Sequence, residues 1–308
     1  MRIKIVYGNH TSFGIHVADT LLLIQKLFEL AGLRADFEQK FSSGNLNVVL
    51  EGFNDKFTLE AERAMQVKGS RLIIVATEFL TGTTFNDFNA ESDNSHYSKG
   101  EYWSHRFNNF LKLEKYSEAV WHLSESEVSP FRRLLGHDRV FYLPHFWVPG
   151  LSRVEHLSDR EKDIDFLFTG TETNYRLAIL DILKQKGYRV EHALTAAFHR
   201  EDLLARTKIS LNIRQNAEWQ YPSPSRFFYH LINSSLLITE KCSSEADIQE
   251  HVLTAPEGKL IEFCDEQLAA GEYTKRGAEF MEAFKAKHQM RNISSWLIEA
   301  SLSRRDID

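Results

Sequence analysis

The 308-residue sequence contains only two cysteines, Cys242 and Cys264. Neither belongs to a CxxC pair or to a set of cysteines and histidines at zinc-binding spacing, so no disulfide framework is implied. Both thiols are most simply interpreted as buried apolar side chains in a reducing cytosol. The sequence also lacks an HExxH motif and a DxD-like acidic pair near a strand end, which argues against a bound catalytic metal.

Long apolar runs and targeting signals are missing as well. No stretch of 18 or more apolar residues occurs, so no segment is expected to span a membrane. The first residues, MRIKIVYG, lack the charged head and apolar core of a signal peptide, so we expect a cytoplasmic protein and leave peripheral membrane contact open. The net charge of −6 weighs against a protein that coats nucleic acid, although a local basic patch is compatible with it.

The residues that are present suit a two-domain α/β protein. A hydrophobic content of 43% and only six prolines leave enough apolar material for two cores. A chain of this length has a prior of two domains of about 150 residues each. The stretch LPHFWVPGLSRVEHLSDREKD combines Pro and Gly breakers with charges, which places a boundary near Pro149. The predicted domains are residues 1–149 and 150–308.

Both halves alternate between strand and helix patterns, which predicts two doubly wound domains with parallel sheets. A polar loop over residues 81–99 is long enough to be a lid or a binding loop. The spacing of apolar residues over 275–299 is helical, and the C-terminal helices are predicted to pack across the junction between the domains. The strands are predicted at residues 2–7, 33–38, 46–52, 71–78, 119–123, 139–143, 163–170, 188–194, 208–213 and 235–239.

The segment 208–242, KISLNIRQNAEWQYPSPSRFFYHLINSSLLITEKC, is the most informative because it reads as strand, polar loop, helix and strand. Ser223 is placed to cap the helix and Pro224 suits its first position, so Ser225 and Arg226 lie in the first turn. A cation there opposes the helix dipole by about 0.3–1 kcal/mol. Arg226 therefore indicates a bound phosphate or carboxylate at the helix start.

The alternative is that Arg226 is solvated or paired with a nearby acid such as Glu218. The context favours the anion site, because parallel α/β sheets bind ligands at the carboxyl ends of their strands. Arg214 follows the strand that precedes the helix and belongs to the same predicted edge.

The segment FLFTGTETNYR, residues 166–176, has the same pattern of a strand, a polar turn and a helix with an arginine near its start. A strand ends at Gly170, which permits close approach of a phosphate, and Thr171 and Arg176 offer a hydroxyl and a charge. The pattern is neither GxGxxG nor GxxxxGK[ST], so neither a dinucleotide fingerprint nor a P-loop is supported.

The first strand leads to YGNHTSFGIHVADTL, in which Gly14 and His16 lie near the start of a helix. Their predicted place is a cleft on the acceptor side, and the alternative is that His16 caps or packs against the helix. His10 titrates near neutral pH and is a candidate general base, or else a plain loop residue. Glu78 ends a buried strand and is the other candidate base, with a plain surface acid as its alternative.

The order of these segments resembles the GT-B glycosyltransferases, particularly the group-1 C-terminal domain of the spore-maturation-like subfamily. The resemblance rests on DFLFTGTETNYR, on the strand SLNI and on PSPSRFFYHLINSSLLITE, and more loosely on GNHTSFGIHVADTLLLIQKLFELAGL and VFYLPHFWVPG. It implies that residues 1–149 hold the acceptor and residues 150–308 hold a nucleotide-sugar donor. The predicted donor-binding residues are Gly170, Thr171, Arg176, Arg214, Tyr221, Ser225, Arg226, Tyr229 and Glu240.

Two positions depart from the family. Relatives usually carry a glutamate for the donor ribose where this chain has Tyr229, and a glycine where it has Ser234. Either the tyrosine hydroxyl replaces one hydrogen bond or the donor is held differently.

The predicted function is transfer of a sugar from a nucleotide sugar to a hydroxyl of a saccharide, protein, lipid or modified nucleic acid, without a cofactor. Arg214, Arg226 and the helix start would stabilise the leaving diphosphate without a metal. His10 or Glu78 would act as base if the reaction inverts configuration, whereas a retaining reaction requires none. The alternatives are a degenerate GT-B-like module that binds a nucleotide or sugar without turnover, and a two-lobed small-molecule sensor.

Overall fold

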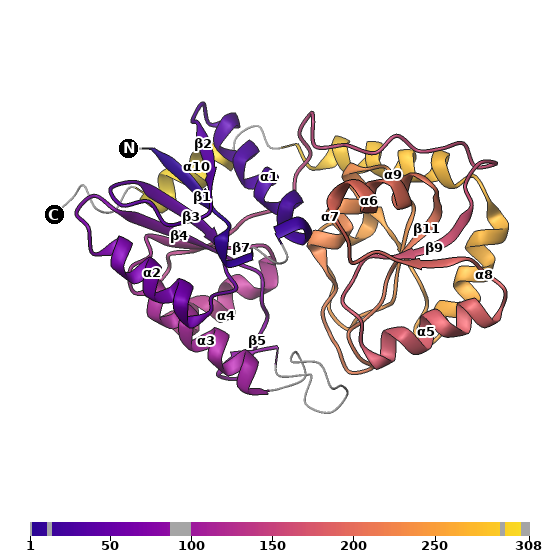
Figure 1. Cartoon of the computed structure of the whole chain (residues 1–308), viewed down its shortest axis with the longest axis horizontal. Helices are drawn as coiled ribbons and strands as arrows, with labels where there is room; N and C mark the ends of the chain where they lie inside the picture. Colours follow the sequence, from indigo (N-terminus) through magenta and orange to yellow (C-terminus); the bar gives the residue numbers. More distant parts are fainter. Residues whose placement is uncertain (1, 11–13, 87–99, 290–292, 303–308) are drawn as a thin grey trace. The chain divides into compact units, whose positions relative to one another are not determined.

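The computed structural model describes residues 2–10, 14–86, 100–289 and 293–302. These residues form two compact units (Figure 1). Unit 1 contains the described residues up to 86 together with 100–144 and 293–302, and unit 2 contains residues 145–289. No helix among them is both long and apolar enough to cross a membrane.

Unit 1 is built on a six-stranded parallel sheet in the order β2-β1-β3-β4-β7-β8. Every residue of β1, β3 and β7 is buried, which is the pattern of a parallel sheet covered on both faces. A short antiparallel hairpin, β5 (Leu80–Thr81) and β6 (Thr84–Phe85), follows β4. The sheet strands are β1 (Ile3–Val6), β2 (Ala35–Glu38), β3 (Leu46–Leu50), β4 (Arg71–Ala76), β7 (Ala119–His122) and β8 (Val140–Tyr142).

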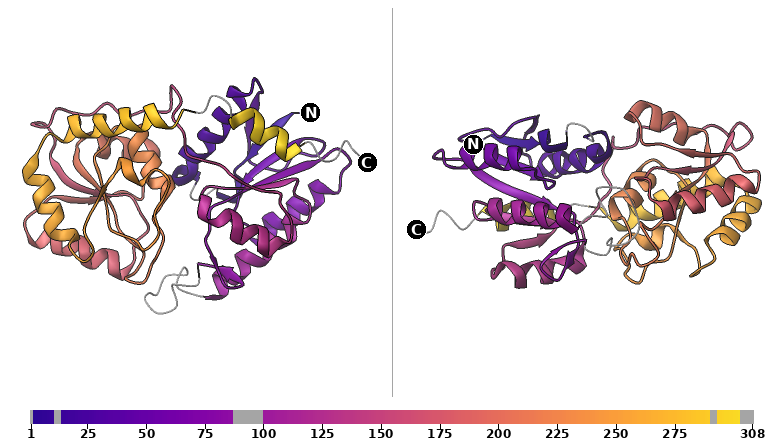
Figure 2. Two further views of the ribbon diagram at one scale, coloured as in Figure 1. Left: turned by 180° about the vertical axis from the view of Figure 1, so that it is seen from behind. Right: turned by 60° about the horizontal axis from the view of Figure 1, so that its bottom comes forward.

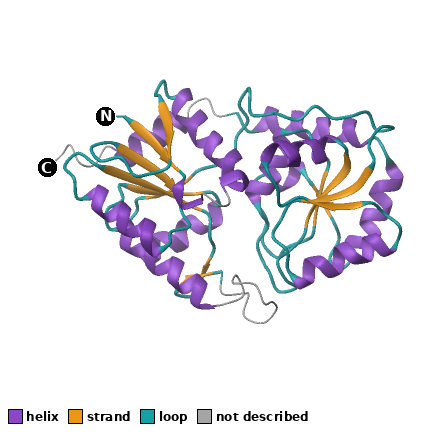
Figure 3. Cartoon of the chain, in the orientation of Figure 1, coloured by secondary structure: helices purple, strands orange, loops and turns teal. Residues whose placement is uncertain are grey.

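Helices cover both faces of this sheet (Figure 1, Figure 3). One face carries α1 (Gly14–Leu30) and α10 (Ile293–Leu302), which contact each other. The other face carries α2 (Asp55–Met65), α3 (Gly100–Glu114) and α4 (Glu125–Leu135).

Helix α10 belongs to unit 1 although it lies at the end of the chain. Ser301 accepts a hydrogen bond of 2.8 Å from Trp121 Nε1, and the Leu302 carbonyl accepts one of 2.9 Å from Arg71 Nη2. The helical stretch predicted over residues 275–299 is therefore divided between the two units. The structure has two helices there, α9 (Tyr273–Lys287) in unit 2 and α10 in unit 1, which Figure 2 shows as separate elements.

This arrangement changes the division of the chain into domains. Unit 2 begins at His145, close to the predicted boundary near Pro149, but it ends at Gln289 instead of the last residue. The difference arises because the apolar face of α10 packs on unit 1, where Leu297 is fully buried. A continuous helical spacing in the sequence does not show on which core a helix packs.

Unit 2 repeats the architecture with a five-stranded parallel sheet in the order β10-β9-β11-β12-β13. Helices α5 (Asn174–Gln185) and α8 (Leu260–Ala270) cover one face, and α6 (Ala197–Ala205), α7 (Pro224–Ile232) and α9 cover the other (Figure 1). The strands are β9 (Ile164–Phe168), β10 (Val190–His192), β11 (Thr207–Asn212), β12 (Leu237–Thr239) and β13 (Leu253–Thr254).

Candidate functional site

The carboxyl ends of three neighbouring strands of unit 2 carry the polar residues that the sequence singled out. Strand β9 leads to Gly170, β11 leads to Arg214 and β12 leads to Glu240. Because the strands are parallel, these ends lie at one edge of the sheet, which is where open α/β sheets bind their ligands.

Arg226 lies in the first turn of α7 and reaches the end of β11. Its Nη1 donates a hydrogen bond to the side-chain oxygen of Asn212, and its guanidinium carbon lies 5.5 Å from the centre of the Phe168 ring. Burial lowers the pKa of Arg226 to about 10, so the group is still a cation at neutral pH. No carboxylate pairs with it among the described residues. The partly exposed cation is thus held by a neutral amide, and an anion would complete its environment.

The start of α7 agrees with the prediction in position but not in detail. Ser223 is the N-cap residue and Pro224 the first helical residue, yet the Ser223 side chain makes no capping hydrogen bond. Its backbone carbonyl instead accepts bonds of 3.0 and 3.1 Å from the N–H groups of Arg226 and Phe227. Ser225 lies in the same turn and is partly exposed.

Gly170 lies against the guanidinium of Arg226. A Cβ atom at this position would come within 2.8 Å of Arg226 Nη2 and 2.4 Å of the Phe168 ring. The lack of a side chain therefore lets the end of β9 and the start of α7 come together. Thr171 follows, partly exposed, and its carbonyl accepts a hydrogen bond of 2.8 Å from Arg176 Nη1.

Arg176 donates its hydrogen bonds to backbone carbonyls of the loops that follow β9 and β11. Its Nε donates to the carbonyls of Ile213 and Arg214 at 3.1 and 3.0 Å, and its Nη2 donates to Ile213 at 2.9 Å. The side chain is 5% exposed, and burial followed by the nearby charge of Arg226 holds its pKa well below the ordinary value. These contacts tie the end of β9 to the end of β11, which makes Arg176 a positioning residue.

Arg214 and Glu240 satisfy each other. Arg214 Nη2 lies 2.8 Å from Glu240 Oε1, and the backbone N–H of Arg214 donates to Glu240 Oε2 at 3.0 Å. The hydroxyl of Tyr175 also donates to this carboxylate. The positive charge of Arg214 is therefore already balanced at the strand edge, in contrast to that of Arg226.

The two tyrosines predicted to contact the donor lie in different surroundings. Tyr221 belongs to the loop between β11 and α7, where its ring packs edge-on against Trp219 at 6.4 Å between ring centres. Tyr229 is 4% exposed and packs in the core with Leu203 and Leu204. The guanidinium of Arg200 covers the Tyr229 ring at 4.1 Å. Tyr229 is thus part of the packing between α6 and α7.

Three residues near Arg226 were missed by the sequence reasoning. Asn212 holds the guanidinium, and its own amide nitrogen donates to Thr239 Oγ1 at 2.8 Å. His192 stacks on Phe168 at 5.5 Å and bonds the Gly170 carbonyl through Nε2 at 2.6 Å. His230 is fully buried, and burial followed by the charge of Arg226 holds its pKa well below the ordinary value. Only the position of Asn212, at the end of a predicted strand, could have indicated a role.

The carboxyl ends of the strands in unit 1 carry a second polar cluster, which contains His10. His10 Nε2 lies 3.2 Å from the Leu50 carbonyl. Because a carbonyl only accepts, this nitrogen carries the hydrogen and Nδ1 is left as an acceptor. Burial lowers the pKa of His10, so the ring is neutral at neutral pH. A Cβ at Gly52 would come within 2.8 Å of this ring.

Glu78 lies at the same edge and is fully engaged. One carboxylate oxygen forms an ion pair with Arg106 of α3, and the other accepts a hydrogen bond from Asn86 Nδ2. Arg106 is also covered by the rings of Tyr102 and Trp103, at 5.6 and 5.4 Å. The predicted candidate base is therefore the partner of a buried cation.

Glu51 was not singled out from the sequence, yet it is the most perturbed acid of this cluster. It follows β3, is 2% exposed, and its Oε1 accepts from the N–H groups of Thr77 and Glu78 at 2.5 and 2.8 Å. Oε2 has no hydrogen-bond partner within the described part of the chain. Burial, and secondly the negative charge of Glu78, raises the pKa of Glu51 to about 7. A carboxyl group with such a pKa can take or give a proton at neutral pH.

Several predicted features lie beyond what the structure describes. The backbones of Gly14 and His16 lie in the first turn of α1, but their side chains are outside the described residues. Of the predicted polar loop, residues 81–86 form part of the β5–β6 hairpin, and residues 87–99 are outside the described part. The acceptor-side assignment of Gly14 and His16 stays a prediction.

Comparison with known proteins places the fold. No family model and no curated protein matches the sequence. Among solved structures, AviGT4, a glycosyltransferase involved in avilamycin A biosynthesis, is similar with a TM-score of 0.51 and 12% identity, over 98% of this chain and 97% of that one. This chain has a GT-B-type fold. At such identity the likeness is one of fold alone.

Two further structures have lower scores. Anabaena Alr3699/HepE, in complex with UDP-glucose, gives a TM-score of 0.48 at 12% identity, over 98% of this chain and 99% of that one. TarM gives a TM-score of 0.47 at 9% identity, over 85% of this chain. The match covers 55% of TarM, so this chain spans about half the length of that protein.

Proposed function

We propose that the chain is a glycosyltransferase of the spore-maturation-like subfamily that transfers a sugar from a nucleotide sugar to a hydroxyl acceptor. In this proposal unit 2 binds the donor and unit 1 binds the acceptor. The observation that carries it is Arg226, a cation without an acidic partner in the described structure, at a helix start and at the carboxyl ends of β9 and β11.

The chemistry follows from where charge develops. As the bond between the sugar carbon and the phosphate oxygen breaks, the electron pair stays on that oxygen while a new bond forms to the acceptor oxygen. Arg226 and the positive end of the α7 dipole stabilise the diphosphate, so in this proposal no metal is needed for this step. Gly170, Thr171 and Ser225 line the same place, and Arg176, Arg214 and Glu240 hold the loops around it.

The acceptor proton requires a base if the configuration is inverted. In unit 1, His10 and Glu51 are the groups we propose for this, because Glu78 is engaged with Arg106. His10 carries its hydrogen on Nε2, so Nδ1 has the lone pair that a base needs, and Glu51 has an unbonded carboxylate oxygen in the described structure and a pKa of about 7. The buried free thiols of Cys242 and Cys264 are compatible with the cytoplasmic location that belongs to the same proposal.

The test measures nucleotide binding in the full chain. UDP, GDP, CDP, ADP and TDP are added with and without EDTA, and the unfolding temperature is recorded, since a ligand bound only by the folded state raises stability. Stabilisation by one nucleotide that EDTA does not alter supports the proposal. Arg226→Gln should lower that affinity roughly 10- to 100-fold, the value of a charge-assisted bond.

Arg189→Gln is the matched control. Arg189 precedes β10 and pairs with Asp163, so it lies at the opposite end of the strands from Arg226. Its loss should leave nucleotide binding unchanged. Equal effects of the two substitutions, or no stabilisation by any nucleotide, would overturn the donor site.

A second function is favoured by Tyr229. The family position for a ribose-binding glutamate is occupied here by a core residue, so no carboxylate is available there. A module that binds a nucleotide or sugar without turnover is therefore the alternative. Release of free nucleotide from the stabilising nucleotide sugar, with an acceptor present, separates the two: binding with no release supports the module.

A further inference from the structure

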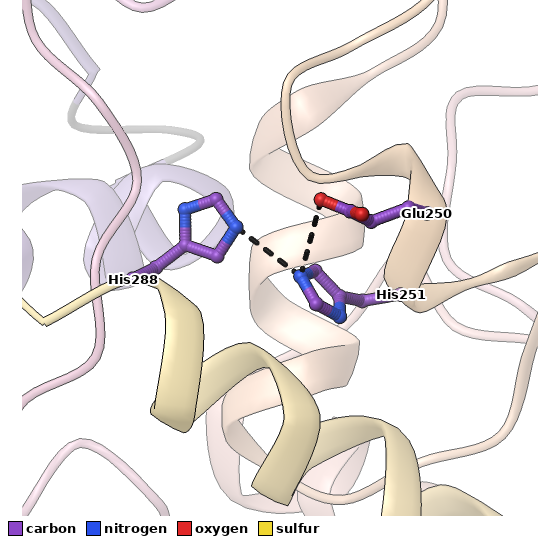
Figure 4. A group of neighbouring side chains, drawn as sticks. All are labelled: Glu250, His251 and His288. Atoms are coloured by element: carbon purple, nitrogen blue, oxygen red, sulfur yellow. Dashed lines mark hydrogen bonds and ion pairs between the residues drawn. The ribbon is translucent and has the colours of Figure 1, made fainter.

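A cluster of ligating side chains lies in unit 2 away from the carboxyl ends of its strands. Glu250 and His251 belong to the short 3-10 helix η3 (Gln249–His251), and His288 caps the end of α9 (Figure 4). One ligand atom of each residue lies within 4.8 Å of the others. None of the sequence predictions included these residues.

The separations are those of a metal site. The two Nε2 atoms of His251 and His288 face each other at 3.2 Å, and His251 Nε2 lies 3.7 Å from Glu250 Oε1. Two nitrogens bound to one tetrahedral zinc ion at about 2.0–2.1 Å stand roughly 3.3 Å apart. Two imidazoles and one carboxylate are also the donor set that zinc takes in proteins. We propose that Glu250, His251 and His288 bind a zinc ion.

The state of the rings agrees with this. His251 is 5% exposed and His288 is partly buried, and their Nε2 atoms face each other. Without a metal, the two facing nitrogens can share only one hydrogen. A cation between them would satisfy both lone pairs at once.

A third imidazole lies close by. His145 is fully buried, and neither of its ring nitrogens has a hydrogen-bond partner in the described part of the chain. Its ring packs on Phe228 at 5.1 Å, and Phe228 packs against Phe284, on which His288 stacks. The Trp147 N–H also donates to the His288 carbonyl at 2.9 Å, which holds this segment beside the end of α9. A buried imidazole without partners is the group expected beside a metal.

Lys287 is the competing partner, because its ammonium pairs with Glu250. Both side chains are at least half exposed, and exposed pairs contribute little to stability. The lysine can therefore turn into solvent when an ion takes the carboxylate.

A bound ion would link segments of unit 2 that lie far apart in its sequence. Among the described residues of unit 2, His145 is the first and His288 nearly the last, and η3 lies between them in the sequence. His288 also stacks on Phe284 at 5.1 Å, and Phe284 packs against Phe228 of α7 at 6.3 Å. The ion is thus structural, supporting the helix that carries Arg226, and the inference does not depend on sugar transfer.

The test uses the full chain and the metal alone. After treatment with EDTA and gel filtration, the protein is titrated with Zn²⁺, and bound metal and unfolding temperature are measured. Co²⁺ is used in parallel, since tetrahedral cobalt absorbs visible light strongly. We expect one tightly bound ion per chain and a higher unfolding temperature. His288→Ala should abolish both effects, and Glu250→Gln should weaken binding.

Matched controls keep the test decisive. Glu282→Gln removes an acid that pairs with Lys285 on the same helix, and His199→Ala removes an exposed imidazole. Both should bind zinc like the original chain. Zinc binding that survives His288→Ala, or no binding by the original chain, overturns the site. If His288→Ala fails to fold, His288→Asn provides the same comparison. Nucleotide stabilisation that EDTA leaves unchanged shows that the two sites are independent.

Discussion

The two units differ in how the charged side chains at the carboxyl ends of their strands are paired. In unit 1, Arg106 is matched by Glu78, and Glu51 adds a second carboxyl group. In unit 2, Arg214 is matched by Glu240, but among the described residues Arg226 has a hydrogen bond to an amide and no acidic partner. A matched cation stabilises the fold, whereas an unmatched one is available to a ligand. The same architecture thus offers proton-accepting groups in one unit and an anion site in the other.

The largest difference in the free energy of unfolding should appear when Arg106 and Arg226 are each replaced by glutamine. Arg106→Gln leaves the partly buried Glu78 without its charge partner, and breaking such a pair costs up to about 3–5 kcal/mol. Arg226→Gln removes a desolvated cation that no acid in the described part of the chain balances, so the free energy of unfolding should change by less than about 1 kcal/mol. Denaturant unfolding measures both. Equal losses would show that Arg226 is structural.

The next effect concerns pH and Glu51. Its pKa is raised from 4.5 to about 7, so the folded protein keeps a proton that the unfolded chain releases in this interval. Stability should therefore fall as pH rises from about 5 to about 8, by up to about 3 kcal/mol. Glu51→Gln should remove this fall, while Glu282→Gln should not. Unfolding measured across the interval tests it, and an unchanged slope in Glu51→Gln would contradict the assignment.

A smaller difference is expected between two glycines that follow the first strand of each unit. A Cβ at Gly8 would come within 1.8 Å of the Gln39 carbonyl oxygen, whereas one at Gly170 meets side-chain atoms of Phe168 and Arg226. Overpacking costs about 1–3 kcal/mol, so Gly8→Ala should reach the upper end and Gly170→Ala the lower end. Only Gly170→Ala should weaken nucleotide binding. The reverse order in thermal unfolding would contradict this reading.

The smallest effects are expected for two tyrosine hydroxyls. Tyr175→Phe removes a bond to Glu240, and Tyr102→Phe removes the acceptor of a 3.0 Å bond from Arg106 Nη1. Each should cost about 0.5–1.5 kcal/mol. Only Tyr175→Phe should also reduce nucleotide affinity, because it loosens the Arg214 and Glu240 pair. Nucleotide affinity and the free energy of unfolding are measured for both variants. An unchanged affinity in Tyr175→Phe would show that the Arg214 and Glu240 pair does not contribute to nucleotide binding.

Much of the fold was predictable because it depends on local patterns. Alternating patterns predicted every strand of the two sheets except β13, and Gly170 was predicted at the end of a strand and Arg226 in the first turn of a helix, where the structure has them. Strand β13 and helix α8 were not predicted. The zinc cluster could not be foreseen, since Glu250, His251 and His288 come from segments that only packing brings together.

The sequence by itself determined the alternation of strands and helices, the two apolar cores and the positions of the residues at strand ends, because these follow from neighbours along the chain. The tertiary structure alone decided which charges are paired. Arg176 donates to backbone carbonyls and Arg214 pairs with Glu240, whereas Arg226 has no acidic partner within the described residues. It also decided that Tyr229 is a core residue and that the pKa of Glu51 is raised to about 7. The physical reason is that burial and charge pairing depend on residues distant in sequence, which local patterns do not record.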